Sequence, residues 1–148
     1  MRWSAFAEQE PELAAFGEAR LRAAPVYLGT VRADGVPRVH PVTPIFGNGG
    51  MYLFMEPTSP KGRDLRERGS FAMHNAVPDN DGAGGEFWIA GRGEPVEDEE
   101  TRAAVAAAST YAPDDRYVLF ELSVTEARCN GYGDVALPSV TRWRERGA

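Results

Sequence analysis

The fold of this chain is decided by the stretch VYLGTVRADGVPRVHPV, residues 26–42. Residues 26–31 have the β-branched and aromatic composition of a strand. Ala33-Asp34-Gly35 follows and carries an Asp-Gly turn signal, and an extended pattern resumes from Pro37 to Phe46. The sequence therefore predicts a β-hairpin here.

Outward from this hairpin, strands continue to dominate. We predict further strands at 51–55, 70–77, 86–96 and 116–124, and shorter extended segments at 126–132 and 139–145. Helices are predicted at 3–23, 59–68 and 97–109, and residues 78–85 form a polar loop. Because hairpin turns join the first three strands, the pattern favours a mainly β fold. We expect a six-stranded antiparallel barrel with short helices outside, forming a single domain over residues 1–148.

Composition restricts the class of protein. The chain has 148 residues, 43% hydrophobic and 26% charged, which is ordinary for one globular domain. A net charge of −6 argues against a nucleic-acid partner. We find no membrane span and no signal peptide, so we expect a cytoplasmic protein without a membrane partner. The single cysteine, Cys129, excludes an intrachain disulfide and the usual structural zinc sites, and we predict no metal.

The predicted helix that begins at Ser59 breaks a charge rule. It places Lys61 and Arg63 in its first turn, where cations are disfavoured by about 0.3–1 kcal/mol each. Lys61 is also the only lysine among 16 basic residues. The helix predicted at 97–109 begins instead with four acidic residues, as the helix dipole favours. A bound anion would resolve this conflict, since broken local rules often mark functional sites.

Phosphate is the anion that suits this helix start. Free backbone N–H groups attract it, and the hydroxyls of Thr58 and Ser59 would add hydrogen-bond donors. Gly62 has no side chain to obstruct the approach, and Arg38 could supply a second cation from the neighbouring strand. Two alternatives remain open: the basic side chains of residues 61–68 could form a solvated helix face, and Arg38 could be an exposed side chain at a sheet edge.

The strand after the first hairpin alternates its side chains. Arg38, His40 and Val42 share one face, and Val39, Pro41 and Thr43 share the other. Pro37 and Pro41 lack N–H donors, which suits an edge strand. Unpaired backbone groups on such an edge could hydrogen-bond a planar polar ring.

These segments together resemble the FMN-binding split-barrel family, also called pyridoxamine 5′-phosphate oxidase-like proteins. The matching segments are residues 27–31, 34–39, 52–54, 58–65 and 71–74. The resemblance implies a Greek-key split barrel, an FMN cofactor, a small-molecule substrate and a homodimer with flavin at the subunit interface. A physical argument favours the same dimer, because a six-stranded barrel has no interior room for a ligand and one chain would cover only one side of the flavin.

The resemblance also implies roles for individual residues. The cofactor-binding residues would include Gly62 and two groups: Arg38, Thr58, Ser59 and Lys61 at the flavin phosphate, and Val39, His40, Val42 and Thr43 along the ribityl chain and ring. Thr43 stands where the oxidases carry a lysine. The cofactor-binding residues would also include Tyr132, which replaces an aromatic residue of the oxidases, but residues 133–137 lack the Arg and His that grip substrate in the true oxidases. The resemblance therefore does not extend to that oxidase activity.

Three functions remain open at this point. The first is an FMN-dependent oxidoreductase that exchanges hydride or electrons with a nicotinamide or small organic partner. The second uses a deazaflavin, whose long anionic tail would need the wider basic groove that Arg63, Arg66 and Arg68 could provide. The third is a flavin or haem carrier without turnover, in which His40 or His74 could ligate haem. No catalytic acid or base is assigned, and Trp143 could cover the core or touch the flavin.

Overall fold

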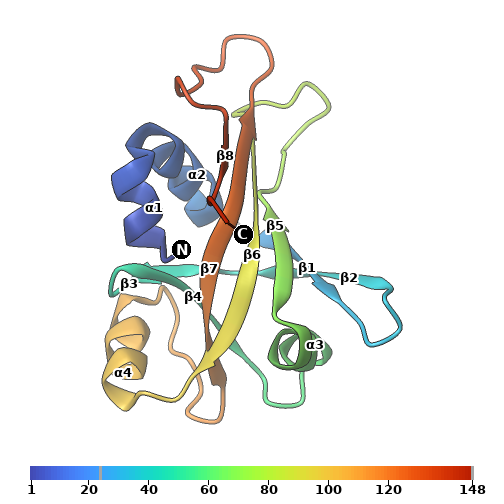
Figure 1. Cartoon of the computed structure of the whole chain (residues 1–148), viewed down its shortest axis with the longest axis vertical. Helices are drawn as coiled ribbons and strands as arrows, with labels where there is room; N and C mark the ends of the chain where they lie inside the picture. Colours follow the sequence, from blue (N-terminus) through green and yellow to red (C-terminus); the bar gives the residue numbers. More distant parts are fainter. Residues whose placement is uncertain (24, 148) are drawn as a thin grey trace.

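The computed structural model describes residues 1–23 and 25–147. Its strands form one antiparallel sheet in the order β2-β1-β5-β6-β7-β4-β3, and β8 pairs with β7 beside this path (Figure 1). The strands are β1 (Val26–Val31), β2 (Pro37–Val42), β3 (Ile45–Gly47), β4 (Gly50–Met55), β5 (Ser70–His74), β6 (Glu86–Val96), β7 (Val118–Asn130) and β8 (Arg142–Arg144).

The connectivity makes this sheet curl. β2 and β3 are its two outermost strands, yet only Thr43 and Pro44 separate them along the chain. Because two residues span only about 7 Å, the ends of the sheet must approach each other. The result is a curled half-barrel, and the predicted mainly β split-barrel fold with flanking helices is confirmed.

The predicted count of six strands is wrong for the part of the chain that the structure describes, which has eight. The segment predicted as extended from Pro37 to Phe46 is split, since Pro44 cannot donate to a strand ladder and β3 begins after it. The segment 126–132 mostly continues β7 without a break, and 139–145 contains the short β8. β5 ends at His74, and the side chain of the next residue, Asn75, bonds to the backbone of Phe87, Ala76 and Gly85.

The helices follow the sequence signals with one correction. The single helix predicted over 3–23 is two helices, α1 (Trp3–Gln9) and α2 (Pro11–Ala23). Glu10 between them has φ −132° and ψ 69°, because a residue before proline is pushed out of the helical region. α3 spans Pro60–Arg68 and α4 spans Glu99–Ala108, where the Asp98 carboxylate accepts a hydrogen bond from Thr101 N–H (2.7 Å).

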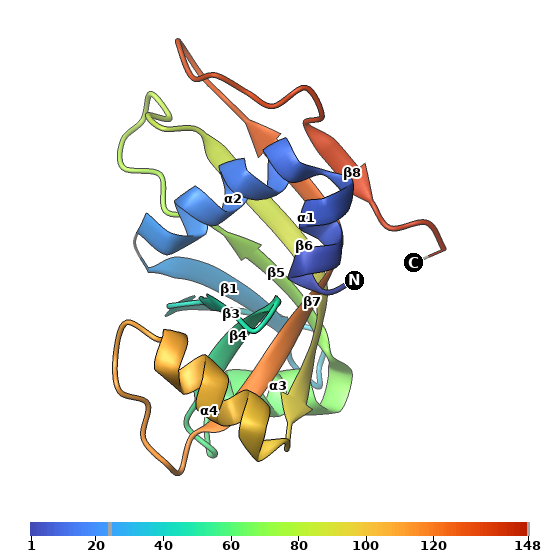
Figure 2. The ribbon, with the colours of Figure 1, turned by 90° about the vertical axis from the view of Figure 1, so that its left-hand side faces the viewer.

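The core lies inside the curl and under the helices. α1 and α2 cover the half of the sheet near β8, and α4 covers the other half (Figure 2). Trp3 and Phe6 of α1 are buried among Phe46, Phe87 and Trp143, and the ring of Trp143 lies 4.8 Å from that of Phe6. Trp143 therefore covers the core, which is one of the two roles predicted for it.

Two negative findings complete the fold. Among the described residues, no helix is both long and apolar enough to cross a membrane. Within the same ranges, no group of three or more potential ligand side chains is placed to hold a metal ion. Cys129 is buried, and burial raises the pKa of its thiol.

Candidate functional site

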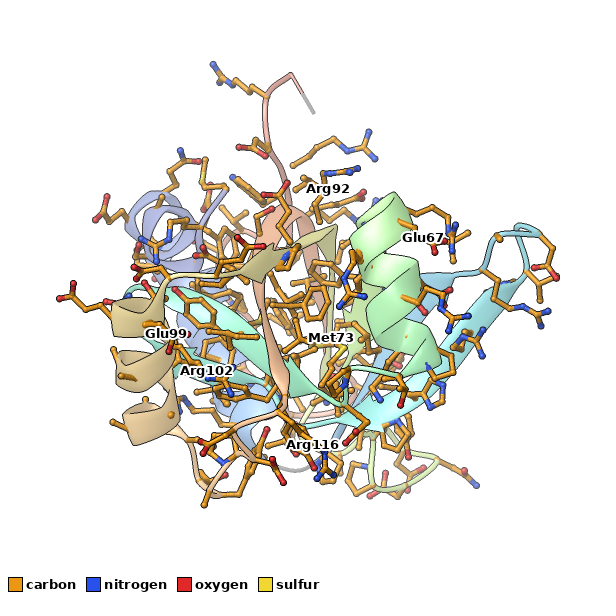
Figure 3. The ribbon with its side chains drawn as sticks, turned by 90° about the horizontal axis from the view of Figure 1, so that it is seen from below. Glu67, Met73, Arg92, Glu99, Arg102 and Arg116 are labelled. Atoms are coloured by element: carbon orange, nitrogen blue, oxygen red, sulfur yellow. The ribbon has the colours of Figure 1, made fainter. Side chains whose placement is uncertain are left out.

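The start of α3 has the composition that the sequence predicted. Ser59 caps the helix, its hydroxyl accepting a long hydrogen bond from Gly62 N–H (3.4 Å), and Pro60 is the first helical residue. The first turn carries Lys61 and Arg63 and no acidic residue. α3 stands on the opposite side of the strands from α4, with the buried Met73 between them (Figure 3). Because the first turn has no acidic residue, these two cations interact unfavourably with the helix dipole in the folded chain.

β2 presents a free backbone edge beside this helix start. It pairs only with β1, and Arg32 N–H donates to the Val36 carbonyl at the hairpin (3.0 Å). Because hydrogen-bonded pairs alternate in an antiparallel ladder, the backbone groups of Arg38 and His40 face β1 and those of Val39 face outward. Pro37 and Pro41 fall on the outward positions. The edge thus offers carbonyl acceptors and, in mid-strand, a single donor at Val39.

Arg38 reaches from β2 to α3. Its Nε donates to Oδ2 of Asp64 (2.9 Å), which also accepts from Thr30 Oγ1 (2.8 Å). Arg68 Nη2 donates to the other carboxylate oxygen at 3.3 Å. Asp64 is buried, and although burial pushes the pKa of its carboxyl up, the hydrogen bonds from Arg38 and Thr30 hold it below its usual value. Arg38 is therefore fixed against the helix by a buried anion.

His40 and Lys61 lie within electrostatic reach of each other. The pKa of His40 is lowered, first by burial and then by the neighbouring charges of Lys61 and Arg38. The pKa of Lys61 is lowered by burial alone, and no carboxylate among the described residues forms an ion pair with it. The structure thus brings together three predicted residues, Arg38, His40 and Lys61, around an uncompensated ammonium group.

A hollow of about 230 Å³ opens between the first hairpin and α3. It is lined by Arg32, Ala33, Asp34, Arg38, Pro60, Arg63, Asp64, Glu67 and Arg68. Most of its charges are paired, since Arg32 bonds Asp34, and Arg38 and Arg68 bond Asp64. Within the described part of the chain, Arg63 has no such partner. Arg38 and the first residue of α3, Pro60, therefore border the same hollow, and one unpaired cation, Arg63, faces it.

The reason given for Gly62 needs correction. A Cβ at this position would face Met55 and Phe120 in the core at 3.6–3.8 Å, not an approaching ligand. Gly62 is buried, and its side-chain position faces residues of β4 and β7 at ordinary van der Waals distance. Its backbone N–H remains at the helix start.

The other predicted residues fall in two places. Thr58 is exposed in the turn before Ser59. His40 and Val42 are half-buried on one face of β2, Val39 is exposed on the other face, and Thr43 is exposed in the link that follows the strand. Tyr132 lies in the loop between β7 and β8, at the opposite end of the molecule from α3 (Figures 1 and 2), where its hydroxyl bonds Glu86 (3.3 Å). One chain alone does not bring Tyr132 to the helix start.

The sequence did not single out a second hollow of about 360 Å³ on the outer face of the sheet. It is lined by His74, Glu86, Trp88, Glu126, Arg128 and Asn130. His74 Nδ1 lies 2.6 Å from the carbonyl oxygen of Asn75. A carbonyl only accepts, so Nδ1 is the donor in this contact, and in the neutral imidazole the lone pair is then on Nε2. The only sequence signal for this group is the alternation of β5 and β6, which puts His74 and Trp88 on one face.

The chemistry of the first site suits a phosphate monoester. A half-buried ammonium, a guanidinium held through one of its nitrogens, the Lys61 N–H in the first helical turn and nearby hydroxyls are all hydrogen-bond donors for an oxyanion. The adjoining edge of β2 can hydrogen-bond the polar rim of a planar ring. These residues fit a flavin mononucleotide.

The sequence profile described as pyridoxamine 5′-phosphate oxidase matches residues 10–130. The chain belongs to this family. The match includes the first hairpin, α3 and the long strands β6 and β7, so the split barrel and both hollows fall within the family's region. No curated protein sequence matches the chain.

Solved structures with the same fold come from several bacteria. A heme binding protein from Mycobacterium smegmatis is 25% identical with a TM-score of 0.63 over 86% of this chain, which spans 57% of that protein's length. A NimC/NimA family protein from Clostridium acetobutylicum is 16% identical, with a TM-score of 0.67 over 85% of this chain and 92% of that one. HutZ, the heme storage protein from Vibrio cholerae, is 15% identical, with a TM-score of 0.54 over 91% and 93%.

Proposed function

We propose that this chain binds FMN at the start of α3 and acts as an FMN-dependent oxidoreductase on a small organic molecule or a nicotinamide. The phosphate would lie against Lys61, Ser59 and Arg38, and the flavin ring would run along the free edge of β2. FMN, when bound, supplies the hydride or electron chemistry through its ring system. The side chains of this chain bind the cofactor, orient it and neutralise its charge.

The observation that carries this proposal is the uncompensated charge of Lys61. Its ammonium group is half-buried, its pKa is lowered by that burial, and both Lys61 and Arg38 act electrostatically on the same imidazole, that of His40. Partial burial of an unpaired charge costs free energy, which a dianionic phosphate would recover. Membership of the pyridoxamine 5′-phosphate oxidase family supports the same cofactor.

The direct test is binding of flavin to the purified protein. We expect added FMN to bind with quenching of flavin fluorescence, and riboflavin, which lacks the phosphate, to bind at least about tenfold more weakly. A parallel titration with a deazaflavin cofactor separates the two flavin classes, because a preference for the deazaflavin would contradict the choice of FMN. Protein that takes up none of these cofactors would reject the proposal.

We also propose that two copies associate through the outer face of β1, β2, β5 and β6. Tyr27 and Val39 are exposed there, next to Gly29, Ala72 and the indole of Trp88, around a shallow hollow of about 210 Å³. A contiguous apolar face of this kind is typical of an interface. It adjoins the free edge of β2, so a second copy would cover the ring of a flavin that one chain leaves open. The cofactor would then lie at the subunit interface.

A haem carrier without turnover is the second candidate. The heme binding protein and the heme storage protein named above share this fold. In this chain His74 carries the supporting observation, since the hydrogen bond from Nδ1 to the Asn75 carbonyl directs the free lone pair of Nε2 away from the backbone. A lone pair fixed in this way suits an axial haem ligand.

Hemin titration tests this candidate. A Soret shift that His74→Ala abolishes and His40→Ala leaves unchanged would favour haem at the outer face. Sustained oxidation of reduced nicotinamide by the FMN-loaded protein, above the rate of free flavin, would instead favour the oxidoreductase.

A further inference from the structure

We infer that Asp64 is a positioning residue for phosphate recognition: it fixes the guanidinium of Arg38 so that its remaining N–H donors are presented to the anion. The inference rests on the proposed binding of FMN and adds to the site a residue, Asp64, that the sequence did not identify. It runs against simple electrostatics, because a carboxylate near an anion site should by itself weaken anion binding.

The first step is the burial of the carboxylate. Asp64 is 4% exposed, yet both of its oxygens have donors: Thr30 Oγ1 and Arg38 Nε on Oδ2, and Arg68 Nη2 on Oδ1. A buried carboxylate with such partners stays ionised, which agrees with its lowered pKa. The carboxylate is therefore a fixed negative point between β1, β2 and α3.

The second step is the geometry of Arg38. It bonds Asp64 through Nε, and no other partner of its guanidinium occurs among the described residues. The two terminal nitrogens keep their four N–H donors for another acceptor. Arg38 lines the hollow beside α3 and also lowers the pKa of His40 together with Lys61. Arg38 therefore borders the same hollow as the unpaired Arg63, and it lies within electrostatic reach of His40, as Lys61 does.

The third step is the cost of holding an arginine in one rotamer. Arg38 projects from an edge strand, and fixing a long side chain in one rotamer costs conformational entropy. Lys61 and Arg63 also repel it. If Asp64 supplies that restraint before the ligand arrives, the cost does not fall on binding. Thr30 supports the restraint, since its buried hydroxyl fixes the oxygen that Arg38 uses.

The test compares FMN with riboflavin, because their affinity ratio reports only on the phosphate. We expect Asp64→Asn to lower the FMN preference about tenfold, the size of one lost charge-assisted hydrogen bond, and to leave riboflavin affinity unchanged. The matched control is Glu67→Gln, which removes a negative charge from the same hollow without touching Arg38. This control should keep the preference or increase it slightly.

A double-mutant cycle separates positioning from general damage. In an Arg38→Ala background, Asp64→Asn should cause no further loss of phosphate preference, because the side chain that it positions is absent. If Asp64→Asn does not fold, Thr30→Val gives the second measurement, with an expected loss of about threefold from its single hydrogen bond.

The outcomes are distinct. Asp64→Asn with an unchanged or increased FMN preference would overturn the positioning role and leave the proposed function intact. An equal loss in the Arg38→Ala background would also overturn it. Wild-type protein that binds FMN no better than riboflavin would overturn the phosphate site itself, and the positioning role with it.

Discussion

Lys61 is the residue on which the phosphate site most depends. Its ammonium group is half-buried, unpaired within the described residues, and close enough to His40 to lower the pKa of that imidazole. We expect Lys61→Ala to weaken FMN binding by about 1.5–3 kcal/mol, since a charge-assisted hydrogen bond is lost. Lys61→Arg should cost less but not be neutral, because a planar fork replaces a compact ammonium.

The control for this prediction lies on the same helix. Arg66 is exposed on α3 and carries the same charge as Lys61, from which it is separated by less than two helical turns. Arg66→Ala should change FMN affinity only slightly and with a strong dependence on salt. Fluorescence titration at two ionic strengths measures both. Equal losses in the two alanine variants would mean that Lys61 belongs to a solvated basic helix face.

Asp64 gives a prediction for stability against pH. Its pKa in the folded chain is lowered, so the stability that it contributes is fully present above its unfolded pKa of about 3.9. This contribution is lost as the pH falls through the folded pKa. We expect Asp64→Asn to be less stable than wild type at pH 7, and the difference in free energy of unfolding to shrink below about pH 4. Urea titrations across this range would contradict the prediction if the difference stayed constant.

At the scale of elements, the start of α3 combines a helix cap with a ligand site. Ser59→Ala removes the cap hydroxyl and should lower the free energy of unfolding by about 1 kcal/mol, and it should also weaken FMN binding. Asp98 caps α4 in the same way, far from the site. Asp98→Ala should therefore cost similar stability with FMN affinity unchanged. Denaturation and titration of both variants separate the two effects, and unchanged FMN affinity in Ser59→Ala would remove Ser59 from the site.

Local signals predicted most elements because each depends on neighbours in sequence. Asp34-Gly35 gave the first hairpin, Ser59-Pro60 the start of α3, and the bounds of β6 agree with the prediction. One error has a local cause, because Pro11 moves Glu10 out of the helical region and divides the helix predicted over 3–23. The other errors concern short strands. β3 and β8 are only three residues long, too short for a periodic pattern to identify.

The site residues also divide into those that a local sequence pattern identifies and those that only the folded chain brings together. The alternation of β2 placed Arg38 and His40 on one face, and the broken charge rule identified Lys61, so these residues could be found from sequence. The contact between Arg38 and Asp64 joins positions 26 residues apart through the packing of α3 on the sheet. No local pattern contains that information. The outer hollow around His74 likewise exists only once β5, β6 and β7 pair.

In the molecule as a whole, the outer face of the sheet bears on two features, the exposed apolar side chains and the distant position of Tyr132. The chain has few exposed large apolar side chains, and Tyr27, Val31 and Val39 lie side by side on the paired strands β1 and β2. Tyr132, predicted to contribute to the site, is at the far end of the same chain. A second copy placed on the outer face would cover the apolar side chains and could bring its own loop toward the flavin. The proposed dimer thus offers Tyr132 a route to the site that one chain lacks.

The outer face therefore carries the last prediction. Tyr27→Asp places a charge in the middle of the proposed interface, where it would be desolvated without a partner, so we expect the variant to sediment as a monomer while wild type sediments as a dimer. Its FMN affinity should fall, because the ring loses the cover of the second copy, even though Lys61 and Arg38 are untouched. Tyr111→Asp is the matched control, an exposed tyrosine beside α4 and remote from this face, and it should remain dimeric with normal affinity. Circular dichroism would show whether both variants keep their fold. A wild type that sediments as a monomer at all concentrations would refute the interface, and a monomeric Tyr27→Asp with unchanged FMN affinity would show that the flavin needs only one chain.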